Sequence, residues 1–323
     1  MQNFHKPNIV ISNCIEHEAC RYDGSMIKNS FIEKLKSHVN FSTVCPEVGI
    51  GLPIPRDTLR VVNIDDIEKI VISKTGEDVT EKMKQFSDDF INNLNNDEID
   101  GFILKGKSPS CGIKDVKVYT STEKGPALPK KSSGIFANIA LDKYPNILVE
   151  NEGRLTNYNI REHFLTRIFT QAMFREIKKK KSMKDLIDFH SNNKYLLMAY
   201  SPGNLKTLGK LVANNDKNEI GQILREYEFY LNKALSMVLK PMRNVNMLLH
   251  LFGYFSKELS SNEKAFFLDK LEKYSAKQVP LSVPVAIINS WVMRFNNEYL
   301  ANQTIFEPFP SELIEVTDSG KGL

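Results

Sequence analysis

The chain has 323 residues, of which 41% are hydrophobic and 25% are charged, and its formal net charge is +4. This composition excludes a disulfide-stabilised miniprotein and a disordered chain, and the length allows two domains with real cores. No apolar run is long enough to span a bilayer, and the N-terminus lacks a signal pattern, so we expect a cytoplasmic protein without a membrane partner. In a cytoplasmic protein, four cysteines point to metal binding or thiol chemistry.

The first half of the chain alternates short apolar segments with amphipathic ones. Segments typical of buried strands are residues 9–12, 41–44, 61–64, 101–104 and 147–149. Helical spacing covers residues 29–39, 78–94 and 132–141. Asp78 is the expected N-cap of the second helix, because Glu81 follows three residues later. Alternating strands and helices predict an α/β domain over residues 1–155 with a mostly parallel, Rossmann-like sheet.

The second half shows helical spacing and no confident strand. A helical connector is expected over residues 156–184, an all-α bundle over 185–313, and a loose tail over 314–323. The expected helices of the bundle cover residues 185–200, 204–213, 219–239, 243–259, 262–274 and 283–300.

Three of the four cysteines follow predicted strands. Cys14 comes after residues 9–12, Cys45 directly after 41–44, and Cys111 a few residues after 101–104. The carboxyl ends of parallel strands meet at one edge of the sheet, where ligands gather. Three thiols there suggest a metal cluster with one open coordination position, since the paired Cys-x-x-Cys ligands of a zinc site are absent. The alternative is that these cysteines are small buried apolar residues.

Five ordered blocks of the first half resemble the thiouracil desulfidase family. They are residues 14–24, 45–56, 101–119, 134–137 and 152–155. Residues 185–313 resemble the YbgA-like helical domain. The matching segments there are residues 189–190, 194–198, 208–209, 244–246, 250–255 and 308–310. The fusion of the two domains resembles the RudS-type desulfidases, which remove sulfur from 4-thiouridine in tRNA.

The resemblance implies a 4Fe-4S cluster held by Cys14, Cys45 and Cys111, with one iron lacking a protein ligand. Cys20 is then a non-ligand, because relatives often have Val before Arg-Tyr-Asp-Gly. The implied reaction is hydrolytic and non-redox, and it converts 4-thiouridine in tRNA to uridine with release of sulfide. The sequence departs from the family around the first ligand, where relatives read Ser-Ala-Cys-Leu-Leu-Gly and this chain has Asn13 before Cys14 and Ile-Glu-His after it.

Several polar residues near the predicted ligands are candidates for catalysis. Glu47 lies two residues after Cys45 and is the expected base that activates water, although a capping or surface role is the alternative. Ser110 is expected beside the cluster and Ser108 near the substrate, although both could simply shape the turn. The candidate substrate-binding residues are Arg21, Tyr22, Arg56 and Lys105.

The two halves of the chain differ in charge. Residues 1–150 contain 19 basic and 21 acidic residues, whereas residues 151–323 contain 24 and 18. Basic and aromatic side chains in the second half suit phosphate contacts and base stacking, so tRNA is the expected partner and DNA is not. The candidate RNA-binding residues are Lys206, Lys210, Arg243, Asn246 and His250.

Three alternatives remain open from the sequence. The first is a desulfidase of free thiouracil or thiouridine, with small thiopyrimidines as its substrates. The second is a non-catalytic iron–sulfur protein that binds RNA or acts as a sensor. The third is a zinc protein, which its lack of colour would distinguish from an iron–sulfur protein.

Overall fold

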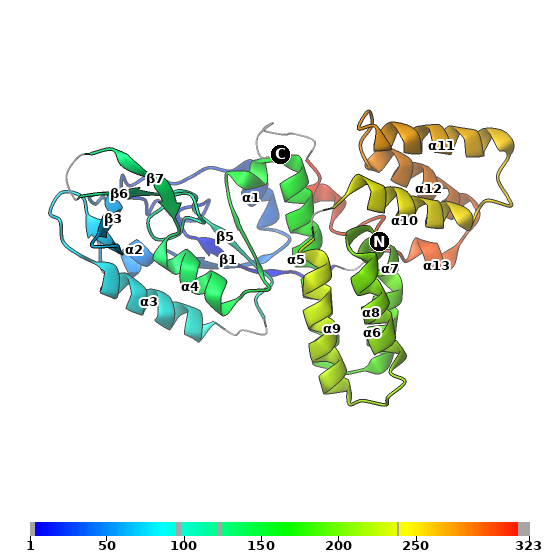
Figure 1. Ribbon diagram of the computed structural model, residues 1–323, viewed down its shortest axis with the longest axis horizontal. Coiled ribbons are helices and arrows are strands. Elements are labelled where there is room, and N and C mark those ends of the chain that lie inside the picture. Colours follow the sequence, from blue (N-terminus) through cyan, green and yellow to red (C-terminus); the bar gives the residue numbers. More distant parts are fainter. Residues whose placement is uncertain (1–3, 95–97, 122–124, 238, 316–323) are drawn as a thin grey trace. The chain divides into compact units, whose positions relative to one another are not determined.

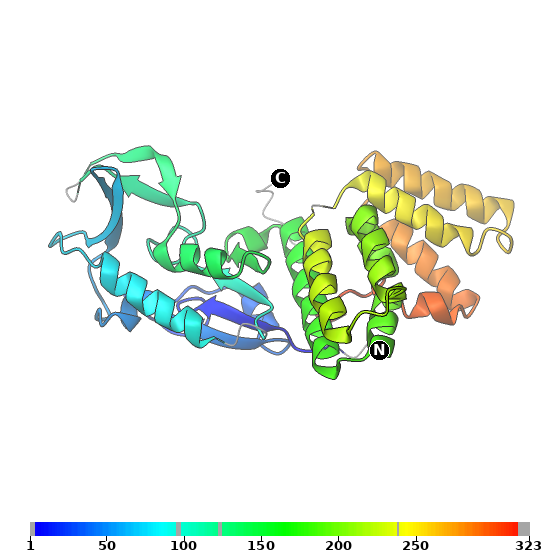
Figure 2. The ribbon, with the colours of Figure 1, turned by 60° about the horizontal axis from the view of Figure 1, so that its bottom comes forward.

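The computed structural model describes residues 4–94, 98–121, 125–237 and 239–315 (Figure 1; Figure 2). The chain forms two compact units. The first unit contains the described residues up to Ala172 and those from Phe309 onward, and the second contains Met173–Pro308. The predicted tail over residues 314–323 lies outside the described residues from position 316 on.

The first unit is built on a four-stranded parallel sheet in the order β2–β1–β5–β8. Its strands are β1 (Asn8–Ser12), β2 (Asn40–Val44), β5 (Gly101–Leu104) and β8 (Leu148–Asn151). The predicted α/β domain with a parallel sheet is therefore confirmed, and so are four of the five predicted strands.

Helices cover both faces of this sheet (Figure 1). They are α1 (Ser30–Leu35) and α5 (Tyr158–Lys180) on one face, and α3 (Thr80–Asn93) and α4 (Ile135–Lys143) on the other. Successive side chains of a strand point to opposite faces. Ile9 and Ile11 accordingly pack in the core with α1 and α5, whereas Val10 packs in the core with α3 and α4.

The fifth predicted strand, residues 61–64, belongs to a second sheet that the sequence did not predict. This sheet has the order β4–β3–β6–β7. Its strands are β3 (Leu59–Ile64), β4 (Ile67–Ile72), β6 (Val116–Tyr119) and β7 (Ala127–Ser132). The pairs β3–β4 and β6–β7 are antiparallel, and only β3–β6 is parallel. Asp65 and Asp66 both have positive φ, which matches the two-residue turn that joins a hairpin.

The N-cap predicted for the second helix is wrong by one residue. Helix α3 begins at Thr80 and its N-cap is Val79. Asp78 Oδ1 accepts a hydrogen bond from the backbone N–H of Thr80 at 3.0 Å, because an Asp side chain readily closes a turn onto the residue two positions ahead.

The second unit is all-helical, as predicted. Its helices are α6 (Met183–Asn192), α7 (Lys194–Tyr200), α8 (Pro202–Ala213), α9 (Ile220–Leu235), α10 (Pro241–Gly253), α11 (Ser261–Ser275), α12 (Ser282–Arg294) and α13 (Glu298–Ala301). One core joins α6–α9, and another joins α7 to α10–α12. None of the described helices combines the length and apolar character needed to cross a membrane.

Two helices predicted as continuous are broken. The segment 185–200 divides at the buried Asn193, whose side-chain amide donates to Phe189 O and whose Oδ1 accepts from Thr304. The segment 283–300 divides into α12 and α13, where Asn297 caps the second helix. In both places an Asn side chain hydrogen-bonds to the nearby backbone, which favours a helix boundary. Short 3-10 turns occur at Arg154–Thr156 and Ser311–Leu313.

Candidate metal and active site

The three cysteines that follow strands lie at the carboxyl edge of the parallel sheet. Cys14 comes two residues after β1, Cys45 directly after β2, and Cys111 in the loop after β5. Strand β1 lies between β2 and β5. After β1 the chain adds β2 on one side of β1 and later adds β5 on the other side, so the direction in which the sheet grows reverses at β1. Cys14, Cys45 and Cys111 follow β1 and these two neighbours, at the switch point where ligands bind in such sheets.

Hydrogen bonds hold these strand ends together. The backbone N–H of Asn13 donates to Val44 O at 2.7 Å, which joins the ends of β1 and β2. The backbone N–H of Lys105 donates to Ser12 Oγ at 2.9 Å, which joins the ends of β1 and β5. The segments that carry the three cysteines therefore start from one fixed edge.

All four thiols of the chain gather at this edge, including Cys20. The Cys20 side chain is fully buried and interacts with the thiols of both Cys14 and Cys45. The interaction with Cys14, together with burial, raises the pKa of Cys20 to about 11. Cys20 and then burial raise the pKa of Cys45, and burial raises the pKa of Cys111 to about 12. Without a nearby cation, the thiols of Cys20, Cys45 and Cys111 therefore favour the protonated form.

The donor set fits an iron–sulfur cluster. Cysteine sulfur is the usual protein ligand of such clusters, and a bound metal ion removes the thiol proton that burial otherwise retains. In the described part of the chain, no three His, Cys, Asp or Glu side chains are arranged to bind a single metal ion. The thiols instead come together from three strand ends and one loop, and Cys14, Cys45 and Cys111 are the residues that would hold the cluster.

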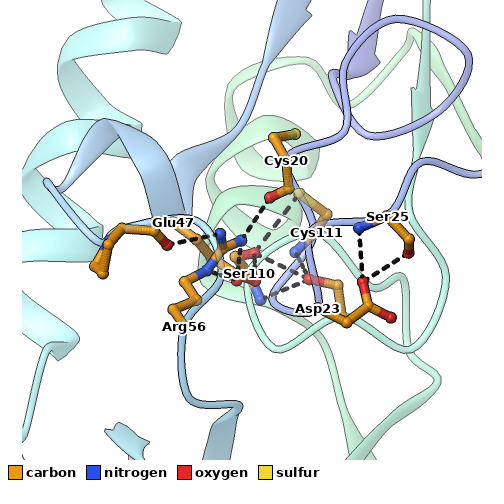
Figure 3. A network of polar contacts seen from close by, with 9 residues as sticks. Cys20, Asp23, Ser25, Glu47, Arg56, Ser110 and Cys111 are labelled. Atoms are coloured by element: carbon orange, nitrogen blue, oxygen red, sulfur yellow. Dashed lines mark hydrogen bonds and ion pairs between the residues drawn. The ribbon is translucent and has the colours of Figure 1, made fainter.

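Glu47 lies beside the thiols with both carboxylate oxygens engaged (Figure 3). It belongs to the short helix α2 (Pro46–Gly49), for which Cys45 is the N-cap. Arg56 donates from Nε and Nη2 to Glu47 Oε2 at 2.9 and 2.6 Å. Ser110 Oγ donates to Glu47 Oε1 at 3.1 Å. The carboxylate is thus fixed on one side by a guanidinium, and its other oxygen faces a hydroxyl next to Cys111.

The two predicted serines form a short hydroxyl chain next to Cys111. Ser108 Oγ lies 2.9 Å from Ser110 Oγ and accepts hydrogen bonds from the backbone N–H groups of Ser110 and Cys111. Ser110 Oγ also lies 3.8 Å from Cys111 Sγ. Because one hydroxyl contacts a thiol, a carboxylate and a second hydroxyl, Ser110 can pass a proton between Glu47 and the thiol edge.

Arg56 differs from the other predicted substrate-binding residues in its burial. Its side chain is only 4% exposed, and Nη2 also donates to Cys20 O at 2.9 Å. Its guanidinium therefore positions Glu47 and the loop that carries Cys20 (Figure 3).

The other predicted substrate-binding residues lie nearer the surface. Tyr22 is exposed, with the Arg21 guanidinium over its ring and also donating to Ser25. Lys105 Nζ pairs with Glu152 Oε1 at 2.7 Å. Glu152 also accepts from the backbone N–H of Gly106, so it anchors the start of the Cys111 loop, a role that the sequence did not assign to it.

A close backbone approach fixes the loop around Cys111. The backbone N–H groups of Phe136 and Ala137, in the first turn of α4, donate to Ser110 O at 3.0 and 3.3 Å. A Cβ on Gly134 would lie 2.3 Å from Ser110 O and 2.8 Å from Cys111 N. Only glycine allows this contact, which is the physical reason for the glycine that opens the block 134–137.

We therefore expect Gly134→Ala to displace the Cys111 loop. The protein should lose about 1–3 kcal/mol of unfolding free energy, the usual cost of forcing atoms into a packed site, and should bind less iron. Gly203→Ala is the matched control, because a Cβ there meets nothing within 4 Å. Chemical denaturation and iron analysis measure both effects, and an iron content in Gly134→Ala equal to that of the control would contradict the prediction.

The predicted RNA-binding residues occupy two helices of the second unit. Lys206 and Lys210 are exposed and one turn apart on α8, and Asn246 and His250 have the same relation on α10. Arg243 is half-buried and donates from Nη1 to Tyr200 O at 2.5 Å, so it also holds α10 against α7.

Comparison with known proteins assigns each half of the chain to a family. The model of a 2-thiouracil desulfurase family matches residues 9–152. The model of a protein family of unknown function, DUF1722, matches residues 194–310.

Two curated proteins, each similar to a different half, show the same division. The uncharacterized protein YbbK of Bacillus subtilis (strain 168) is 30% identical over 155 residues, which cover 46% of this chain and 98% of YbbK. The uncharacterized protein YbgA of Escherichia coli (strain K12) is 26% identical over 136 residues, which cover 42% of this chain and 80% of YbgA.

A solved structure is also similar to part of the chain. It is a [4Fe-4S]-dependent thiouracil desulfidase, TudS, with 27% identity, a TM-score of 0.38, and coverage of 46% of this chain and 93% of that chain. From the two family matches and the relation to YbbK, the chain belongs to the 2-thiouracil desulfurase family through its first half and carries a YbgA-like DUF1722 domain in its second.

Proposed function

We propose that the protein removes sulfur from 4-thiouridine in tRNA, giving uridine and sulfide, with a 4Fe-4S cluster held by Cys14, Cys45 and Cys111. The observation that carries the proposal is the gathering of these thiols beside a carboxylate and a hydroxyl, Glu47 and Ser110, which hydrogen-bond to each other. Such a site combines soft metal ligands with groups that move protons, which is what removal of sulfur by hydrolysis requires.

The overall reaction needs no oxidant or reductant. Water supplies the oxygen of the product carbonyl, the C–S bond breaks, and sulfur leaves as hydrogen sulfide with both protons of the water. A bound cluster would supply an iron that attracts the sulfur of the thiocarbonyl and makes the attached carbon electrophilic. Side chains of the protein transfer the protons and orient the reacting groups.

Glu47 takes a proton from the attacking water at Oε1 and returns it to the departing sulfur. Arg56 occupies the other oxygen, Oε2, so the position of the reactive oxygen is fixed. Ser110 donates to Oε1 before the reaction, and its contact with Ser108 gives the proton a second route. To Arg21 and Tyr22, on the loop after Cys20, we assign contact with the pyrimidine or its ribose phosphate, since Tyr22 is exposed and the Arg21 guanidinium lies over its ring.

A desulfidase of free thiouracil is the second candidate. The name of the matching family, 2-thiouracil desulfurase, favours it. In that case the DUF1722 unit would be an interaction module and not the part that holds tRNA.

The substrate experiment separates these candidates. The anaerobically purified protein is incubated with tRNA that contains 4-thiouridine, or with free 2-thiouracil, and sulfide and digested nucleosides are measured. Conversion of 4-thiouridine to uridine at a higher kcat/KM than that for the free base supports the proposal. A clear preference for thiouracil favours the second candidate, and no sulfide from either substrate favours a non-catalytic iron–sulfur protein.

The charge of the second half supports tRNA as the substrate. Exposed lysines on α8 provide phosphate contacts, while exposed polar groups on α10 can reach base edges. A 4-thiouridine that reacts at the thiol edge must leave its stack, so the tRNA has to be held while one base is extruded. This is the role that we assign to the DUF1722 unit.

We expect Lys206→Ala with Lys210→Ala to weaken tRNA binding by the full chain and to reduce its dependence on salt. Each lost phosphate contact should lower the slope of log affinity against log salt by about 1. Lys270→Ala with Lys273→Ala is the matched control, because both lysines already pair with Asp269. Fluorescence anisotropy across a salt series measures the slopes, and an identical slope in wild type and double variant would exclude α8 as the docking helix.

A further inference from the structure

The fourth cysteine has no role in a three-ligand site, yet it lies among the ligands. Its thiol interacts with the thiols of Cys14 and Cys45, and its side chain is 0% exposed. All four cysteines of the chain thus come together, although they lie on three separate connections: Cys14 and Cys20 share the loop between β1 and α1, while Cys45 and Cys111 follow β2 and β5.

The loop that carries Cys20 is fixed on both sides of the residue. On the N-terminal side, the backbone N–H of Ile27 donates to Cys14 O and that of Glu16 donates to Ile27 O. On the C-terminal side, the backbone N–H of Arg56 donates to Tyr22 O at 2.8 Å, while its guanidinium holds Cys20 O. The inward position of the Cys20 thiol is therefore determined by the fold of the loop.

The chemistry of this position favours a metal ligand. A buried thiol packed among apolar residues is inert, whereas a thiol beside other thiols at a metal site becomes a thiolate ligand. Three cysteines leave one iron of a 4Fe-4S cluster without a protein ligand, and such clusters are commonly held by four thiolates. We propose that Cys20 is the fourth thiol ligand of this site and binds the remaining iron when no substrate is present.

This inference rests on the proposed function and adds a regulatory element to it. A substrate sulfur has to compete with the Cys20 thiol for the same position. Cys20 therefore protects the site between turnovers and raises the substrate concentration needed to occupy it.

The experiment compares how readily one iron is lost from the loaded wild type, Cys20→Val and Cys20→Ala. An iron without a thiolate ligand is released on oxidation and leaves a paramagnetic 3Fe cluster. Each protein is loaded anaerobically and treated with ferricyanide, and the 3Fe signal is followed by electron paramagnetic resonance. We expect the signal to appear about 10-fold faster in both variants, since groups that only support a ligand already contribute 10–100-fold to metal affinity.

Two variants separate ligation from packing. Val nearly fills the buried site and Ala leaves a small cavity, so equal rates in the two variants assign the effect to the missing thiol. The KM for 4-thiouridine tRNA should fall in both variants, because the competing ligand is gone. Thermal unfolding of the metal-free variants verifies that they fold.

The outcomes distinguish this inference from the proposed function. If wild type and Cys20→Val load equally and form the 3Fe signal at the same rate, the fourth-ligand role is refuted while the desulfidase proposal stands. A changed reduction potential with unchanged iron loss would also refute it, since Cys20 would then only donate a hydrogen bond. If wild type assembles no cluster at all, both proposals fail, and iron and sulfide analysis shows this before any oxidation.

Discussion

Replacing Cys14, Cys45 or Cys111 with Ala should abolish cluster binding and sulfide release together. Each of these thiols follows a different strand at the sheet edge, and the remaining cysteine, Cys20, already occupies its own position beside Cys14 and Cys45. We expect at least a 100-fold loss of turnover in each variant, because even a partner of a metal ligand is worth 10–100-fold in metal affinity. The measurement is iron and sulfide content after anaerobic reconstitution, with sulfide release from 4-thiouridine tRNA.

The control for these variants has to separate loss of a ligand from loss of stability. Val62 is fully buried in β3 of the second sheet, a strand that carries no cysteine, and Val62→Ala also truncates a buried side chain. That variant should unfold more easily but still bind iron in the wild-type amount. A cysteine variant that retains wild-type iron and turnover would remove that cysteine from the ligand set.

The position of the site could be predicted because it depends on strand ends. Short apolar runs followed by Cys14, Cys45 and Cys111 are visible in the sequence, and parallel pairing brings such ends to one edge. Ser110 directly precedes Cys111 and Glu47 lies two residues after Cys45, and the hydrogen bond between Ser110 and Glu47 agrees with the prediction that these two cysteines lie close together. Local spacing was sufficient for these residues, because a side chain within two positions of a ligand cannot lie far from it.

The contacts between distant segments could not be predicted in this way. Arg56 appeared in the sequence as a possible substrate ligand, yet its guanidinium lies buried on Glu47 and Cys20 O. That arrangement depends on how the loop after Cys14 folds back over the segment after α2, which has no periodic signal. The second sheet was missed for a related reason: β7 contains Pro129 and two lysines, so it lacks the alternation that marks a strand.

Cys20 illustrates the limit of comparison by motif. Because the position before Arg-Tyr-Asp-Gly often holds Val in relatives, the sequence suggested a passive residue. Burial alone is consistent with that, since free Cys is often a small apolar residue. Only the positions of the neighbouring thiols distinguish a packing residue from a possible ligand.

Glu47→Gln should leave the cluster in place and remove the catalytic base. The amide keeps the shape of the side chain and one oxygen, but it cannot accept a proton from water. General acid–base catalysis contributes roughly 10²–10⁴-fold, so we expect sulfide release to fall by at least about 100-fold with little change in KM. Steady-state kinetics beside iron analysis measures both parts of this expectation.

The same substitution removes the charged partner of a buried arginine, so its effect on stability has to be measured separately. The side chains of Arg56 and Glu47 are only 4% and 14% exposed, and breaking such a pair is destabilising. Ser110→Ala keeps the ion pair and removes only the hydroxyl that faces Oε1, so it should lower turnover without this loss of stability. Glu77→Gln, at an exposed pair with Lys82, is the control for loss of a carboxylate. If Glu47→Gln keeps its iron and turns over at the wild-type rate, the base must be sought elsewhere, and the hydrogen bond from Ser110 to Glu47 would then only position the two side chains.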